Sequence, residues 1–264
     1  MKFYSFASLL LLCSPAWLAA QIAAPMVGFA RYPDSSVEAV YGLPGNFVVT
    51  RAALGTAGAI SFSDYGGLLS RSGKILLLKA DATPVAEYDT AEASPLLSVT
   101  GDLTTALAWL PAGHLLLHWS GSRFVAVPVD DAAFPGNATS LSAVNADHAA
   151  FLVTQPNGSV SQVLVSLTTG AVISSDQLPG VRGFAVRQQS FTVFHDDRGL
   201  EIESTNGNLR TLLIEANDLC FERMSSHWLH LYSPATKQHW ALRLDAADAT
   251  LAMLPAAPAK GGRQ

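Results

Sequence analysis

The most polar short stretch of this sequence is His195-Asp196-Asp197-Arg198, whose side chains are able to ligate a metal, move a proton or contact a partner. An imidazole beside two carboxylates offers a ligand set or an acid–base pair at a loop. The same residue types are favoured by tight turns, and Gly199 follows them. We therefore predict that this tetrapeptide forms the solvated tip of a hairpin. It is a candidate partner-binding segment without a catalytic role.

The spacing of the histidines does not predict a metal centre. His114 and His118 are four residues apart on an expected strand, so they share a face but lie about 13 Å apart. A single ion with ligand bonds of about 2.1 Å does not bridge that distance. His227 and His230 have an odd separation and point to opposite faces. We expect these side chains to be packing or surface residues, and we predict no metal and no cofactor.

Signatures of common enzyme classes are absent. The sequence has no GxSxG, HExxH, Walker-type loop, GxGxxG or CxxC pattern. Asp130-Asp131 and Asp245 to Asp248 lack the spacing of a calcium loop. Cys220 lies between Leu219 and Phe221, and this apolar context predicts a buried, unreactive thiol. No residue is assigned a catalytic role.

The composition is typical of a globular protein. The 264 residues are 49% hydrophobic and only 14% charged, which excludes a disordered chain. A formal net charge of −5 argues against a nucleic-acid-binding surface, because such a surface needs clustered Lys and Arg. Two cysteines exclude a disulfide scaffold.

Residues 1–20 have the pattern of a secretory signal peptide. Lys2 precedes an apolar segment from Phe6 to Cys13, Pro15 ends it, and Ala19-Ala20 offers a cleavage site. The apolar segment is shorter than the roughly 20 residues that cross a bilayer. We therefore expect a secreted or periplasmic protein without membrane insertion.

The rest of the chain consists of short apolar runs separated by turn residues. Ile75 to Leu78 and Val163 to Val165 are continuous runs, which are typical of strands covered on both faces. Asn157-Gly158 and Asn206-Gly207 are strong hairpin signals, because both positions tolerate a positive φ. We predict an all-β protein.

Pairs of runs joined by a turn recur roughly every 40 residues, which is the period of a four-stranded β-propeller blade. Stacking such blades buries both faces of each one, as the continuous runs require. We predict a single β-propeller domain over 21–256 with about six four-stranded blades, five or seven remaining open, and a disordered tail over 257–264. The expected units are a part-blade at 25–56 and full blades at 57–96, 97–137, 138–180, 181–219 and 220–256.

A β-sandwich is the alternative fold, because it also has short strands at regular spacing. It should show cleaner alternation of apolar and polar residues than this chain does.

The segment from Leu164 to Ile173, with Thr169-Gly170 at its turn, resembles the repeats of pyrroloquinoline-quinone-type and related secreted bacterial propellers. In those repeats a Thr-Gly turn precedes a short outer strand. The other repeats share only the period, and the marks of WD and kelch repeats are absent. The resemblance implies a propeller fold and carries over no cofactor.

We expect a monomeric, exported, non-enzymatic propeller that acts as a binding or scaffold module in the bacterial periplasm or outside the cell. A propeller gathers loops from every blade at one face, which suits a protein, peptide or glycan partner. We expect no binding of nucleic acid. The loops that would form this face are Gln155 to Ser159, His195 to Gly199 and Ser233 to Gln238.

The alternative function is a metal-dependent six-bladed hydrolase or lactonase with its site in the central channel. Polar residues on the inner strands would have to converge on a divalent ion. Two of the candidates are arginines, which disfavour a cation site. The candidates are Asp64, Asn145, Arg187, Glu222 and Arg223.

Overall fold

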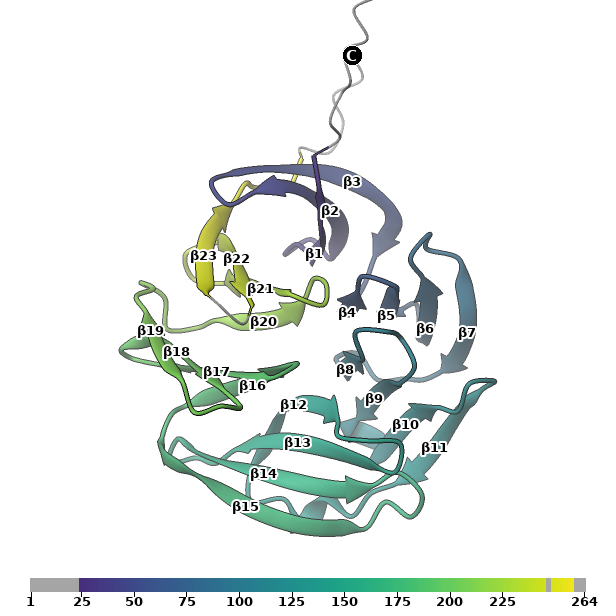
Figure 1. Ribbon diagram of the computed structural model, residues 1–264. Coiled ribbons are helices and arrows are strands. Elements are labelled where there is room, and N and C mark those ends of the chain that lie inside the picture. Colours follow the sequence, from purple (N-terminus) through teal and green to yellow (C-terminus); the bar gives the residue numbers. More distant parts are fainter. Residues whose placement is uncertain (1–23, 246–247, 259–264) are drawn as a thin grey trace, which may run out of the picture.

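The computed structural model describes residues 24–245 and 248–258, and its regular structure there is β-strand apart from two short 3-10 turns. The strands form antiparallel meanders that follow one another around a common centre (Figure 1). The first strand of each meander lies nearest the centre. The predicted all-β propeller is confirmed, and the β-sandwich is not supported.

The first sheet has three strands. It contains β1 (Met26–Arg31), β2 (Ser36–Leu43) and β3 (Asn46–Thr56), paired in that order. This sheet corresponds to the part-blade expected at 25–56.

Three further sheets are separate four-stranded meanders in which successive strands are neighbours. They comprise β8 (Leu96–Val99), β9 (Ala106–Leu110), β10 (Leu115–Trp119) and β11 (Phe124–Pro128); β12 (Asn137–Ala143), β13 (His148–Thr154), β14 (Ser159–Ser166) and β15 (Val172–Val181); and β16 (Phe184–Gln188), β17 (Phe191–Asp196), β18 (Gly199–Ser204) and β19 (Leu209–Leu212).

The remaining strands form one eight-stranded sheet built from two meanders. They are β4 (Ala59–Ser63), β5 (Gly66–Arg71), β6 (Lys74–Lys79) and β7 (Pro84–Asp89), then β20 (Cys220–Arg223), β21 (Trp228–Ser233), β22 (Gln238–Leu244) and β23 (Ala249–Leu254). A single parallel pair, Ser61 with Arg223, joins β4 to β20.

The prediction of six four-stranded blades is wrong. The first sheet lacks a fourth strand, and the pairing of Ser61 with Arg223 merges two meanders into one sheet. The position of β1 explains the merger. Phe29 N donates to Met224 O at 3.1 Å, so β1 lies beyond the end of β20 and leaves the last residue of β20 to pair with β4.

Hydrophobic clusters fill the spaces between neighbouring meanders. Trp109 packs edge-on against Phe151 with ring centroids 5.5 Å apart, between the β8–β11 and β12–β15 sheets. Further clusters lie on both sides of the first sheet, where Val27 contacts the β20–β23 meander and Val37 contacts the β4–β7 meander. Burial from both sides is the reason that the strands carry continuous apolar runs.

The Thr-Gly turn marks a close approach between two sheets. Gly170 has a φ of +72°, and a Cβ built there would lie 1.8 Å from Pro128 O of the neighbouring sheet. Only glycine fits this position.

Two predicted terminal segments are outside the description. Residues 1–20, the expected signal peptide, and 259–264, most of the expected tail, are not among the described residues. Within the described part of the chain, no helix has the length and apolar character needed to cross a membrane.

Candidate functional site: a cationic cup at the centre of the ring

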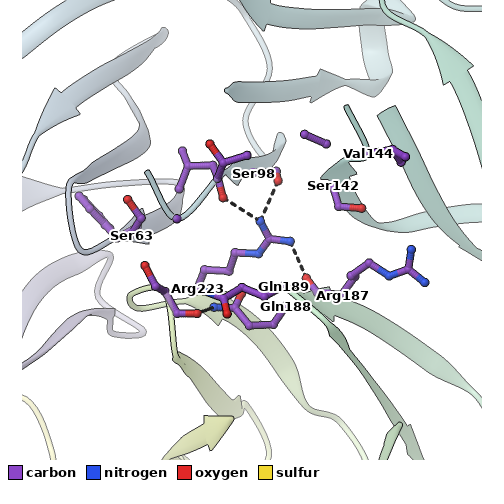
Figure 2. Close-up of a pocket in the computed structure, with 14 residues that line it drawn as sticks. Ser63, Ser98, Ser142, Val144, Arg187, Gln188, Gln189 and Arg223 are labelled. Atoms are coloured by element: carbon purple, nitrogen blue, oxygen red, sulfur yellow. Dashed lines mark hydrogen bonds between the residues drawn. The ribbon is translucent and has the colours of Figure 1, made fainter. Parts of the chain in front are cut away.

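The C-terminal ends of five inner strands surround a cavity of about 260 Å³ at one mouth of the ring (Figure 2). We call this cavity the cup. Its walls carry hydroxyl and amide side chains, and its floor carries arginine. The residues that line it are Phe62, Ser63, Ser98–Gly101, Ser142–Val144, Arg187–Gln189, Arg223 and Ser226.

Arg223 reaches from β20 across the centre of the ring (Figure 2). Its Nη1 donates to Ser98 Oγ at 2.7 Å and to Val99 O at 3.4 Å. Its Nη2 donates to Leu141 O at 3.3 Å and to Arg187 O. One guanidinium therefore ties β20 to β8, β12 and β16.

The charge of Arg223 has no carboxylate partner among the described residues. The side chain is 9% exposed, and burial together with the nearby charge of Arg187 lowers its pKa to about 10. The group is still protonated at neutral pH. A positive charge in a place of low dielectric is costly unless hydrogen bonds or an anion compensate it.

Arg187 adds a second positive charge at the same mouth. Its side chain is half-buried, and burial lowers the pKa of its guanidinium. Within the described chain, that guanidinium makes one hydrogen bond, a long one of 3.5 Å from Nη2 to Thr192 Oγ1. Most of its donors are therefore available to a ligand.

No residue that lines the cup carries a carboxylate. Among the described residues, Asp64 is the acid whose carboxylate bonds a lining residue. It accepts a hydrogen bond from Ser226 N at 3.4 Å but lines an adjoining cavity. The electrostatic potential of the cup is therefore positive, although the whole chain is acidic.

The hydroxyl groups of the cup add donors. Ser98 Oγ accepts from Arg223, and Ser226 Oγ accepts from Asp64 N at 3.2 Å. No acceptor for either hydroxyl proton is found among the described residues, so neither donor is used within that part of the chain.

Gln188 forms part of the same wall and is 2% exposed. Its Nε2 donates to Ser225 O and Ser226 O at 2.8 Å each, which fixes the orientation of the amide. Its Oε1 is buried without a partner in the described structure. The charged groups that line the cup are all positive, which suits an anion.

The opposite mouth holds a cavity of about 210 Å³. Arg223 lines both cavities and so stands between them. Here Arg31 Nε donates to Glu222 Oε1 at 2.6 Å, and Glu222 Oε2 lies 3.9 Å from His230 Nδ1. A carboxylate thus balances the positive charge at this mouth.

The predicted hairpin tip lies at the end of the ring away from the cup. β16 ends at the cup, so the antiparallel strand β17 carries the chain to the other end. Asp197 and Arg198 are exposed there, and Asp196 Oδ1 accepts from Arg198 N at 2.8 Å. A role of this tip in partner binding stays a prediction.

The expectation that His195 is solvated is wrong. Its side chain is 6% exposed, and its Nε2 lies 2.7 Å from Ala216 O. β17 extends two residues further than the apolar run Phe191 to Phe194 indicated, which draws the imidazole beneath the loop before β20.

Two other local expectations are corrected. His114 does not share a strand with His118, because it follows a 3-10 turn with a φ of +51° and precedes β10. Cys220 is exposed and not buried, since it is the first residue of β20, at the end of the strand. Partial desolvation and the charge of Glu222 raise the pKa of its thiol, which disfavours the reactive thiolate.

The inner-strand residues do not converge on a metal site. Arg187 and Arg223 reach the cup and Glu222 the opposite mouth, whereas Asn145 Oδ1 accepts from Asp147 N at 2.9 Å in a turn. Within the described residues, no three His, Cys, Asp or Glu side chains are placed to hold an ion. These groups do not fit a divalent cation.

The cup as an anion site was missed by sequence reasoning. The available signal was the pair Arg187 and Arg223, which stand about one repeat apart at the ends of two inner strands. An arginine that recurs near the end of two inner strands indicates a positively charged centre.

No protein-family model matches the chain, and no curated protein matches it in sequence. Among solved structures, a chain of a nidogen/laminin complex is similar over 85% of this chain and 92% of that one, with 10% identity and a TM-score of 0.54. This likeness shows the fold alone.

Two other structures are similar at lower TM-scores. The β-propeller domain of Cps50 (Swd1) from Myceliophthora thermophila shares 12% identity over 89% of this chain and 87% of that one, with a TM-score of 0.46. Hydrazine synthase of Kuenenia stuttgartiensis shares 9% identity over 88% of this chain and 80% of that one, with a TM-score of 0.44. Neither supports an argument about function. The resemblance to quinone-type repeats stays a prediction.

Proposed function

We propose that this protein is an exported, non-enzymatic binding module and that its ligand presents an anionic group to the cup. The observation that carries the proposal is the position of Arg223, charged and buried at the centre without a carboxylate partner. Export rests on the signal-peptide pattern of residues 1–20.

The hydrogen bonds of Arg223 make it a fixed part of the site. Its Nη donors are taken by Ser98 Oγ and three backbone carbonyls, so the charge is held in place before any ligand arrives. A preorganised charge costs little further ordering when an anion binds. An anion also supplies the compensation that the folded chain withholds.

Arg187 complements this fixed charge with free donors. Its guanidinium is half-buried and weakly bonded, so it can turn toward an anion. A charge-assisted hydrogen bond in such a partly dehydrated site is stronger than one in open water. We assign direct contact with the anion to Arg187 and the supporting field to Arg223.

The hydrolase alternative has less support. A catalytic divalent ion in the channel requires oxygen or nitrogen ligands with negative charge nearby, and the cup offers two arginines instead. The hairpin tip at Asp197 and Arg198 remains a separate proposal for a protein contact on the other face.

Titration calorimetry with acetate and inorganic phosphate at constant ionic strength tests the proposal. We expect saturable binding that weakens about tenfold in Arg187→Gln, because one charge-assisted contact is removed. Arg51→Gln makes the same charge change on exposed β3 and should bind like the unmodified protein. Equal binding by all three proteins, or no binding by any, would reject the cup as an anion site.

A further inference from the structure

An apolar pocket of about 230 Å³ adjoins the cup. The two cavities share Phe62 and Ser63, which form a common wall. The pocket is built where β1, the end of β4, the turn after β6 and the end of β20 come together. Its apolar side chains are Met26, Val27, Phe29, Phe62 and Met224.

We propose that the cup and this apolar pocket together bind the carboxyl-terminal residue of a peptide or protein, one with an apolar side chain such as leucine or phenylalanine. The proposal rests on the proposed function and identifies its ligand. The terminal carboxylate enters the cup, and the side chain crosses the shared wall into the pocket.

The donors of the cup match a carboxylate. Arg187 presents a planar fork that pairs with both oxygens of a carboxylate. Ser98 and Ser226 both line the cup, and their hydroxyl protons have no acceptor within the described part of the chain. Together these groups serve the lone pairs of one carboxylate.

The pocket selects a short apolar group. Phe29 and Phe62 are in contact, with ring centroids 4.6 Å apart, and Met224, which is fully buried, also lines the pocket. Asp64 and Lys79 also line the pocket. An alkyl chain longer than a side chain would have to pass these charged groups, which disfavours a fatty acid.

The charge of the cup distinguishes a chain terminus from a free amino acid. A free amino acid carries an ammonium group next to its carboxylate, and this group would enter a site that already holds Arg187 and Arg223. Like charges at such short range repel each other. The last residue of a peptide has a neutral amide in the same place and avoids the repulsion.

Fluorescence polarisation with a labelled peptide ending in leucine tests the inference. We expect binding to weaken at least about tenfold when the terminal carboxylate is amidated, and about tenfold when leucine is replaced by glycine. Acetyl-leucine should compete with the peptide better than free leucine does.

Two variants separate the parts of the site. Arg187→Gln should remove the preference for carboxylate over amide, and Met26→Ser should reduce the preference for leucine over glycine while the carboxylate preference remains. Met26 is 48% exposed at the start of β1, so the change costs little folding stability. Arg51→Gln is the control for both.

The outcomes distinguish the inference from the proposed function. If acetate binds in an Arg187-dependent manner but acid and amide peptides bind equally, the inference is wrong and the anion site stands. If free leucine competes as well as acetyl-leucine, the ligand is a free amino acid and the peptide assignment is overturned. If nothing binds through Arg187, both fail.

Discussion

At the mouth opposite the cup, Arg31 Nε lies 2.6 Å from Glu222 Oε1, whereas the cup holds Arg187 and Arg223 without a carboxylate in its lining. The two cavities are similar in size and share Arg223. They therefore differ mainly in whether the folded chain supplies its own counter-charge. Under the proposed function, the neutralised mouth contributes to stability and the uncompensated mouth receives the ligand.

The largest effect is expected from Arg223→Met. The change leaves Ser98 Oγ and the carbonyls of Val99, Leu141 and Arg187 buried without their donor. We expect a loss of about 3–5 kcal/mol in the free energy of unfolding, measured with urea. Arg223→Lys should recover part of it, because an ammonium offers fewer donors in a different geometry. Wild-type stability of Arg223→Met would show that the tie across the ring is dispensable.

Acid should lower the stability of the protein through His239, which bonds His230 beside Glu222 of the balanced mouth, and should leave the charges of the cup unchanged. Burial and the charge of neighbouring His230 lower the pKa of His239 to about 4 from 6.5, and His230 Nε2 lies 2.9 Å from His239 Nδ1. The unfolded chain binds this proton near pH 6.5 and the folded chain near pH 4, so the associated stability is present above pH 6.5 and is lost as the pH falls toward 4.

We therefore expect the melting temperature to fall between pH 6.5 and 4, and to fall less in His239→Gln. Tyr232 stacks on His239, Tyr32 packs against it at a tilt, and Glu222 faces His230. The comparison with the variant separates the effect of the histidine from the effects of these neighbours. Identical pH profiles for both proteins would contradict the assignment. The arginines of the cup do not titrate in this range.

Glu222→Gln should convert the balanced mouth into a second anion site. Arg31 and Arg223 would then face the opposite cavity without a carboxylate. We expect a loss of about 1 kcal/mol in stability for this partly buried pair. Adding Glu222→Gln to Arg187→Gln should restore weak acetate binding, measured by calorimetry. A double variant that folds yet binds no acetate would show that charge balance is not what separates the mouths.

The smallest effect is expected at the hairpin tip. Arg198→Gln changes an exposed side chain at the end away from the cup, so stability should change by less than about 0.5 kcal/mol. Peptide binding to the cup should not change. If the tip is a partner site, capture of a protein partner would weaken in this variant alone. Loss of acetate binding in Arg198→Gln would mean that the two ends are coupled.

Local sequence features predicted the fold class well. Continuous runs such as Ile75 to Leu78 are buried on both sides, and Gly158 and Gly207 adopt the positive φ that their turns require. The sequence predicted a solvated His195 and a buried Cys220, and both predictions are wrong. The exposure of each side chain depends on where its strand ends and on which segment covers it. The apolar residues next to these positions in the sequence indicate neither the strand end nor the covering segment.

The sequence alone determined the repeated all-β organisation. Strand and turn signals depend on a few neighbouring residues, and these signals recur about every 40 residues. Only the tertiary structure decided the count of sheets and the character of the centre. Ring closure places Ser61 beside Arg223 and brings Ser98, 125 residues away in the chain, within 2.7 Å of its guanidinium. Contacts over such separations form only when the whole ring closes, so the positive cup appears in the folded protein and not in any local pattern.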